Sequence, residues 1–344
     1  MKHLRARAKG SGKTYYYFDA GGKPRREIPL GSDYVLAVQK WSALMVEHGA
    51  ASAAAVSNFE QLCRVYETRH LPTLATSTQA TQRSDLKHLR AFFCAPEPAP
   101  LAQIKPKHLH QLLQRHVAQP TTANRLKRTF SAMFNLARDW GYTDAPNPTD
   151  GVRGLKVGKR RQNYVTDAVK AAIWQAGAWP LRDAMDLAYL TADRRGDVLR
   201  ATEAQIVDGE LHINQGKTGK RLRVQITGEL AALLERIKAR KAGHKVWASA
   251  LLVNEWGHAL TKQTLRTQWE DARTQAAATA AAAGQHALAA EIKAAWFKDL
   301  RAKASSDVAD QRGEQAASDL LGHEKISTMQ RHYSPRGRRV GPTK

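Results

Sequence analysis

The chain has 344 residues, of which 42% are hydrophobic, so it is long enough for two or three domains with real cores and too apolar for a disordered tail. Its net charge is +23 and its isoelectric point is near 10.2. This excess favours a polyanionic partner, and nucleic acid is favoured over a membrane because no membrane-length apolar run or opening signal peptide is present. Two cysteines, Cys63 and Cys94, argue against a disulfide framework or a zinc site and fit a reducing cytoplasm.

Residues 1–56 combine basic and aromatic side chains with strand and turn patterns. Residues 14–18 predict a strand, 19–23 a turn and 25–29 a returning strand. Residues 35–46 then predict a helix with one apolar face, and the small, polar residues 50–57 predict a linker. We expect a small basic β-sheet with one helix.

Residues 57–153 have the pattern of a small bundle of short amphipathic helices. Phe59 begins the first apolar face, Leu86 lies in a second, Pro106 is well placed to start a third, and Thr122 is a candidate cap of a fourth. The outer face of the fourth helix carries three cations that either contact DNA or form a solvated face: Arg125, Lys127 and Arg128.

Turn residues near 147–152 are followed by a cluster of cations, which predicts a linker over 154–163 that touches backbone phosphates. The cations that we expect to make these contacts are Lys156, Arg160 and Arg161.

Residues 164–344 predict a mixed α/β domain. Thr166 is expected to cap its first helix, and residues 211–213 and 222–226 alternate as strands around a turn at 215–220. The alanine-rich segment 276–290 is expected to be a solvent-facing helical extension without chemistry. The whole chain is therefore predicted to be mainly α with small β-sheets, an α+β fold.

Several motifs in the second half of the chain carry groups suited to chemistry on phosphate. In order, they are Thr191-Ala192-Asp193-Arg194, Gln215-Gly216-Lys217-Thr218-Gly219, Lys298-Asp299-Leu300-Arg301, and Asp319-Leu320-Leu321-Gly322-His323 with Tyr333 ten residues after the histidine. Each motif alone has an ordinary explanation, because Leu-Gly-His is a common string and basic chains contain many arginines and turn lysines. Their order and spacing resemble the catalytic domain of the tyrosine recombinases, the phage-integrase family. The resemblance is strong over the last half of the chain and looser over the first.

The resemblance implies a reaction that cuts DNA without water, metal, ATP or any other cofactor. Tyr333 would be the nucleophile that forms a 3′-phosphotyrosine, and Arg194 and Arg301 would hold the phosphate oxygens. Lys217 would protonate the departing 5′ oxygen, and His323 would donate a hydrogen bond to the phosphate.

Two positions depart from the family pattern. Ala192 stands where the family usually has glycine, and Lys298 stands where histidine is commonest. Lysine is protonated at neutral pH, so Lys298 either acts as a third cation on the phosphate or accepts a proton only if nearby arginines depress its pKa.

The resemblance also implies a domain order and partners. Residues 1–56 would bind arm-type DNA sites or simply contact phosphates, 57–153 would bind the core site, and 164–344 would be catalytic. The protein would be a phage or genomic-island integrase that inserts or excises mobile DNA between attachment sites through a Holliday junction. We expect a homotetramer, a directionality factor, a host DNA-bending protein and a nucleoid location in a bacterial cytoplasm. Residues 336–344 are either a segment exchanged between subunits or a basic tail.

Two other classes remain open from the sequence. A DNA-binding protein of integrase descent would not need to keep the set from Arg194 to Tyr333. A type IB topoisomerase shares the chemistry but would not need the amino-terminal unit, and a synapsis assay on two DNAs separates it from a recombinase.

Overall fold

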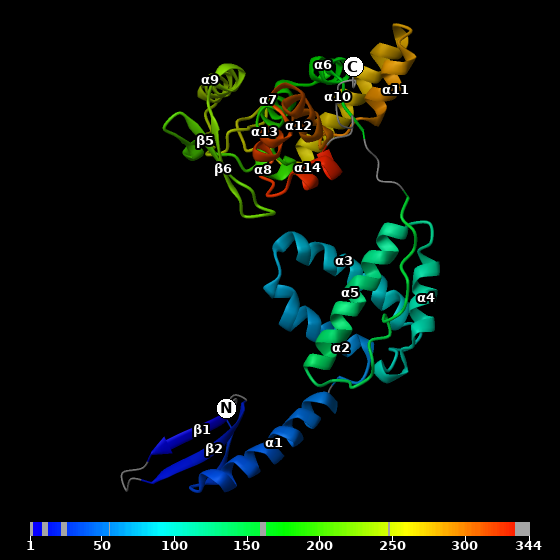
Figure 1. Cartoon of the computed structure of the whole chain (residues 1–344), viewed down its shortest axis with the longest axis vertical. Helices are drawn as coiled ribbons and strands as arrows, with labels where there is room; N and C mark the ends of the chain where they lie inside the picture. The colour runs from blue at the N-terminus through cyan, green and yellow to red at the C-terminus, as the bar shows by residue number, and fades with distance from the viewer. Residues whose placement is uncertain are drawn as a thin grey trace, which may run out of the picture. The chain divides into compact units, whose positions relative to one another are not determined.

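The structure is a computed structural model that describes residues 3–8, 13–21, 26–54, 56–158, 163–246 and 248–333. It divides into two compact units, Met1–Lys159 and Arg160–Lys344. The described residues are mainly helical and contain two small antiparallel sheets, which confirms the predicted α+β fold class (Figure 1). No helix in these ranges is long and apolar enough to cross a bilayer.

The first unit begins with an antiparallel sheet in the order β1 (Leu4–Ala8), β2 (Thr14–Gly21) and β3 (Arg26–Gly31). Helix α1 (Tyr34–Ala54) covers it, and Ala37 packs with Phe18 and Leu30 in a small core. The sequence did not reveal β1. The predicted linker at 50–57 is wrong over residues 50–54, because its alanines favour helix and α1 continues to Ala54.

A helical bundle follows. Its elements are α2 (Phe59–Val65), a π-helical turn (Tyr66–His70), α3 (Thr76–Phe93), α4 (Pro106–Arg115) and α5 (Pro120–Asp139), with short 3₁₀ turns at Leu71–Thr73 and Leu101–Gln103. The rings of Phe59, Phe93 and Phe130 meet in its core at centroid distances of 4.9 to 5.4 Å. Pro106 starts α4 as predicted. Thr122 is not a cap, because Pro120 already supplies the first helical residue of α5.

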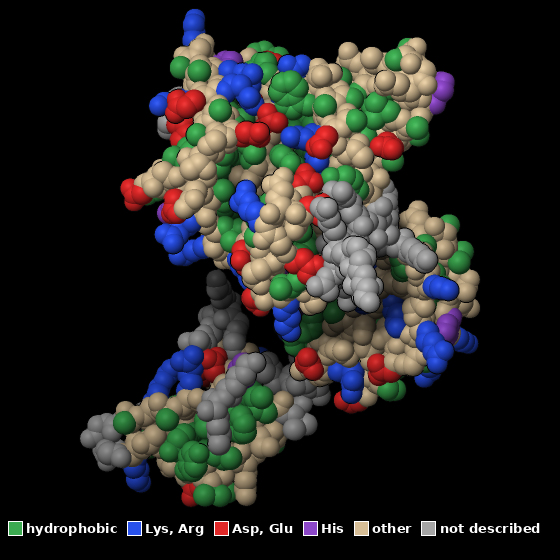
Figure 2. Space-filling model, turned by 45° about the horizontal axis from the view of Figure 1, so that its top comes forward, with side chains coloured by type: hydrophobic (Ala, Val, Ile, Leu, Met, Phe, Trp, Pro, Cys, Tyr) green, Lys and Arg blue, Asp and Glu red, His purple; other side chains and the backbone are tan. Residues whose placement is uncertain are grey.

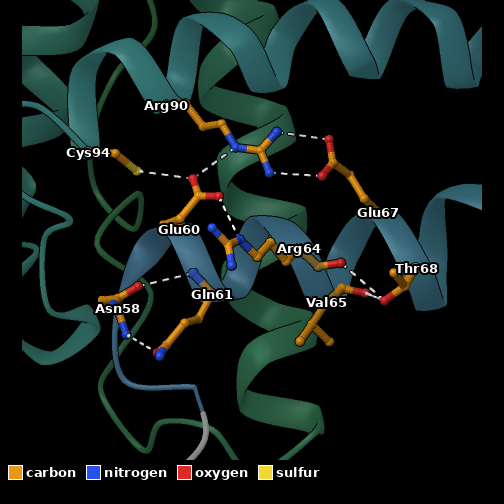
Figure 3. A network of polar contacts seen from close by, with 9 residues as sticks. All are labelled: Asn58, Glu60, Gln61, Arg64, Val65, Glu67, Thr68, Arg90 and Cys94. Carbon is orange, nitrogen blue, oxygen red and sulfur yellow. Dashed lines mark hydrogen bonds and ion pairs between the residues drawn. The ribbon is translucent and has the colours of Figure 1, made fainter.

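A polar network holds α2 and the π-helical turn against α3 (Figure 3). Arg90 donates two hydrogen bonds of 2.8 Å to the carboxylate of Glu67 and one of 2.9 Å to Glu60. Asn58 and Gln61 cap the start of α2 reciprocally. Since the paired groups are only partly exposed, these charge-assisted hydrogen bonds tie α2 and the π-helical turn to α3.

The chain that leaves the bundle is held to α5. The side chain of Asn124 makes two hydrogen bonds of 2.8 Å to the backbone N–H and C=O of Leu155, and Lys127 donates to the carbonyl of Val152. A Cβ on Gly154 would lie 2.7 Å from the Asn124 Oδ1 atom, so glycine allows this close approach. The bundle therefore includes the first two residues of the predicted linker.

The second unit surrounds a larger core that includes Leu187, Leu211, Ile237, Leu265 and Leu300. Its helices are α6 (Asp167–Ala176), α7 (Trp179–Leu190), α8 (Arg195–Val198), α9 (Gly228–Ala242), α10 (Lys262–Ala282), α11 (His286–Ala294), α12 (Asp299–Arg312), α13 (Glu314–Leu320) and α14 (Ile326–Tyr333). Its sheet has the order β4 (Ile206–Val207), β5 (Glu210–Asn214) and β6 (Arg221–Gln225). Thr166 caps α6, and β5 and β6 flank the turn as predicted.

The prediction of a solvent-facing helix over 276–290 is wrong. The segment is interrupted after α10, where Gly284 has a φ of +75°, and α11 then packs against both α10 and α6 (Figure 1). Buried alanines form these contacts: Ala276, Ala277, Ala280 and Ala289. Their small side chains let the helices approach closely, which local composition alone does not reveal.

Candidate active site

Arg194 lies where the chain turns between α7 and α8. Ala192 is fully buried and has a φ of +50°, a left-handed conformation that glycine adopts more readily. This turn brings Arg194 to the N-cap position of α8, where its Nη1 atom donates a 2.8 Å hydrogen bond to the side-chain oxygen of Gln215. An Asp197 carboxylate oxygen lies 3.9 Å from the same nitrogen.

Arg301 lies in the first turn of α12 and is only 3% exposed. Its Nη1 and Nη2 atoms donate to the carbonyl oxygens of Ala192 and Leu321, at 2.5 and 2.9 Å. Burial lowers the pKa of Arg301, while nearby Tyr333 opposes that shift. An arginine pKa starts so high that the side chain stays charged at neutral pH.

The Leu-Gly-His motif forms the turn after α13. Gly322 has a φ of +66°, and a Cβ there would lie 3.3 Å from the side-chain nitrogen of Gln215. Glycine therefore satisfies both the backbone conformation and the close contact. His323 follows, and its backbone N–H donates to the carbonyl of Ser318 at 2.9 Å.

Tyr333 is the last residue of α14 and is partly buried. Its ring centroid lies 5.1 Å from the guanidinium carbon of Arg301 and 5.1 Å from the ring centroid of His323. The Ser306 hydroxyl donates to the Tyr333 carbonyl at 3.4 Å. The structure thus brings together three of the predicted residues directly, and Gln215 connects Arg194 to the same turn.

The two predicted lysines lie at the exposed margin of this group. Lys217 is exposed in the turn between β5 and β6. Lys298 is exposed just before α12, and its ammonium lies 4.1 Å from the centroid of the Trp296 ring. No hydrogen bond or ion pair joins either lysine to Tyr333 within the described ranges.

Acidic residues beside the arginines were not singled out from the sequence. Burial raises the pKa of Asp193 to about 7 against the effect of Arg301, whose Nη1 atom is 4.0 Å away. Asp197 accepts a 3.0 Å hydrogen bond from the backbone N–H of Gly216 and pairs with Arg200. Both residues lie within three positions of Arg194 in the sequence, and this closeness could have identified them as part of the site.

The predicted DNA contacts of the bundle have different environments. Arg125 pairs at 2.8 Å with buried Asp85, and Lys127 holds the Val152 carbonyl, so both contribute to the fold. Arg128 and Lys156 are exposed. Predictions on Arg160, Arg161 and 336–344 lie outside the described residues.

The visible surface carries lysine and arginine side chains in several separate clusters with acidic groups between them (Figure 2). In the part of the chain that the structure describes, no group of three or more His, Cys, Asp or Glu side chains is arranged to hold a metal ion.

Comparison with known proteins identifies the relatives of this fold. Residues 161–336 match the model of the phage integrase family. The chain is 29% identical to the integrase of Escherichia phage HK022 over 248 residues, covering 70% of this chain and 66% of that one. It is 25% identical to the integrase of Enterobacteria phage 434, covering 94% of this chain and 92% of the relative.

Solved structures extend the similarity to the whole chain. A lambda integrase dimer bound to a COC′ core site has a TM-score of 0.67 at 21% identity, covering 100% of this chain and 98% of that one. A lambda integrase tetramer bound to a Holliday junction has a TM-score of 0.66 at 19% identity, with the same coverage. The Tn1549 transposon integrase, in complex with transposon right end DNA, has a TM-score of 0.63 at 15% identity, covering 79% and 94%.

The fold and the sequence matches define a tyrosine-type site-specific recombinase. The chain belongs to the phage integrase family.

Proposed function

We propose that this protein cuts and rejoins DNA through covalent attachment of Tyr333 to a 3′ phosphate. The observation that carries the proposal is the position of the Tyr333 ring, which lies against both the Arg301 guanidinium and the His323 imidazole. The phenol oxygen attacks phosphorus and releases its proton to water, while the bond from phosphorus to the 5′ oxygen breaks. The free 5′ hydroxyl that leaves can later reverse the attack.

The two arginines are suited to hold the phosphate. During attack the non-bridging oxygens gain negative charge, which a preorganised guanidinium stabilises without having to rearrange. Two backbone carbonyls fix Arg301, and its buried Nε atom has no hydrogen-bond acceptor among the described residues. Arg194 contributes the second guanidinium, and His323 donates a hydrogen bond to the phosphate.

The exposed lysines complete the proposed chemistry. Lys217, at the tip of the β5–β6 turn, supplies a proton to the departing 5′ oxygen. Lys298 remains charged and acts as a third cation on the phosphate. The ammonium of Lys298 lies over the indole face of Trp296, which attracts a cation and supports this role.

The proposal assigns one role to each region of the chain. Residues 1–56 bind arm-type sites, 57–153 bind the core site, 154–163 link them to the catalytic domain, and 164–344 carry out catalysis. The substrates are attachment sites on phage or genomic-island DNA and the bacterial chromosome in the nucleoid. A homotetramer forms on DNA, as in the lambda integrase structure with a Holliday junction, together with a directionality factor and a host DNA-bending protein.

A nicked core-site duplex tests the proposal, because release of a short fragment past the nick prevents rejoining and traps the covalent product. We expect a protein–DNA adduct on a denaturing gel, and mass spectrometry of its peptides should place the nucleotide on Tyr333. Attachment at another residue, or cleavage to a free 3′ end by water, would overturn the assignment.

A further inference from the structure

Gln215 is a fully buried side chain that touches several parts of the active site at once. Its side-chain oxygen accepts hydrogen bonds from Arg194 at 2.8 Å and from the Thr218 hydroxyl at 3.0 Å. Its side-chain nitrogen donates to the carbonyl oxygen of Leu321 at 3.2 Å. That carbonyl also accepts from Arg301 at 2.9 Å. One amide therefore lies between both arginines.

The orientation of this amide is fixed by chemistry. A guanidinium only donates hydrogen bonds and a carbonyl only accepts them, so the Gln215 oxygen must face Arg194 and its nitrogen must face Leu321. Gly322 lies close to this nitrogen, since a Cβ added at that position would lie 3.3 Å from it. The two ends of the amide therefore have different partners that match their hydrogen-bonding chemistry.

Gln215 also closes the turn that carries Lys217. Its backbone N–H donates to the carbonyl of Lys220, and its own carbonyl accepts from Thr218 and Gly219, at distances of 2.8 to 3.2 Å. The side chain and backbone of one residue thus fix the base of this turn and the direction of Arg194.

We infer that Gln215 is a positioning residue that holds Arg194 and the Leu321–Gly322 turn in the geometry needed to stabilise charge on the reacting phosphate. This inference rests on the proposed function. Gln215 does not touch DNA in the proposed reaction. It acts because its neutral oxygen directs the Arg194 guanidinium without adding a second negative charge to that of Asp197, 3.9 Å away, and so leaves the remaining N–H donors for the phosphate.

Two substitutions separate this role from simple packing. Gln215→Met keeps the length of the side chain and removes both hydrogen-bonding functions. Gln215→Glu keeps the acceptor for Arg194, but it neutralises that guanidinium and presents a second acceptor to the Leu321 carbonyl. Both variants should bind core-site DNA with nearly wild-type affinity and cleave it about 10- to 100-fold more slowly in a single turnover.

The deciding comparison uses a second substrate, in which a methylphosphonate replaces the scissile phosphate. This group is neutral, so the wild-type protein gains less from its arginines on it. If Gln215 works through Arg194, each variant should slow cleavage of the methylphosphonate less than it slows cleavage of the phosphate. The two slowing factors should differ at least fivefold, which corresponds to about 1 kcal/mol.

Glu324→Gln is the matched control. Glu324 pairs at 2.9 Å with Lys220 on the same turn but touches neither arginine and is 80% exposed. Any reduction in the cleavage rate of Glu324→Gln should be equal on the two substrates.

Wild-type cleavage rates in both Gln215 variants, or equal reductions in rate on the two substrates, would overturn the inference. Failure of the wild-type protein to form any adduct would instead overturn the proposed function. If Gln215→Met does not fold, the comparison of the two substrates is made with the isosteric Gln215→Glu variant alone.

Discussion

The guanidinium carbon of Arg301 lies 5.1 Å from the centre of the Tyr333 ring, although the two residues are on different helices. Helix α12 supplies the arginine and α14 supplies the tyrosine, and the two helices are in contact. A charge fixed by two backbone carbonyls therefore lies beside the phenol before DNA binds. Substituting Arg301 and Tyr333 one at a time therefore measures what each side chain contributes to the proposed cleavage.

Tyr333→Phe should abolish the covalent adduct and leave DNA affinity nearly unchanged. The substitution removes one oxygen and keeps the ring that packs against Arg301 and His323. Adduct formation is measured on a denaturing gel with the nicked substrate, and affinity is measured by mobility shift. An adduct that survives the substitution would place the nucleophile elsewhere.

Variants at Lys298 distinguish a charge from a proton acceptor. If the residue acts as a cation, Lys298→Arg should keep substantial cleavage, and Lys298→Ala should lose more than Lys298→His. Single-turnover rates between about pH 6 and 9 bracket the range in which histidine changes its charge and lysine does not. An inactive Lys298→Arg beside an active Lys298→His with a shifted pH profile would show proton transfer at this position.

Asp307 should make a pH-dependent contribution to stability. Burial alone raises its pKa, but hydrogen bonds from Lys303, Tyr164 and Tyr189, each about 2.8 Å long, lower it overall. Because the folded pKa is lowered, the Asp307 carboxylate stabilises the protein at pH values above its unfolded pKa of about 3.9. This contribution is lost as the pH falls through the folded pKa. Asp307→Asn should therefore reduce the free energy of unfolding by about 1–3 kcal/mol at pH 7.

The difference between wild type and Asp307→Asn should shrink as the pH falls below the unfolded pKa of about 3.9, and it should vanish once the pH has fallen through the lowered folded pKa. Denaturant unfolding at several pH values measures it. Asp271→Asn is the control because that carboxylate is exposed, and its effect should be small throughout. A difference that grows as the pH falls would contradict the prediction.

Arg125 and Arg128 are three residues apart on α5 and should behave differently. Arg125→Ala leaves the buried carboxylate of Asp85 without its cation and should lower the melting temperature. Arg128→Ala should leave the melting temperature unchanged, and if Arg128 contacts a phosphate it should reduce the salt dependence of DNA binding by about one counterion. The reverse pattern would show that Arg125 is the DNA contact.

Deletion of residues 1–56 should spare cleavage of a core site and impair integration between complete attachment sites. The cut removes the whole of α1 and falls before Asn58, which caps α2, so the bundle keeps the start of its first helix. Recombination of plasmids at matched protein concentration measures the effect. Equal integration by the truncated protein would mean that this unit only adds affinity.

Local chemistry in the sequence was enough to predict several elements. Pro106 fixes a helix start, Thr166 caps a helix, and the strands beside the Lys217 turn alternate in hydrophobicity. The catalytic candidates followed from the resemblance and not from local pattern. Gln215 was missed because its importance comes from partners far away in sequence, such as Leu321. The buried alanines of α10 were misjudged for the same reason, since only tertiary contact distinguishes an alanine at a helix interface from one facing solvent.

The hydrogen bonds between Asn124 and Leu155 set a limit on the tether between the two units. Asn124 fixes the chain at Leu155, and the Tyr164 hydroxyl holds its other end to Asp307. Only nine peptide steps separate these two points, so the connecting chain spans at most about 30 Å. If both units bind DNA, as proposed, a tether this short keeps each unit at a high effective concentration for DNA that the other has bound. A flexible insertion after Leu155 would then reduce the affinity of the whole protein.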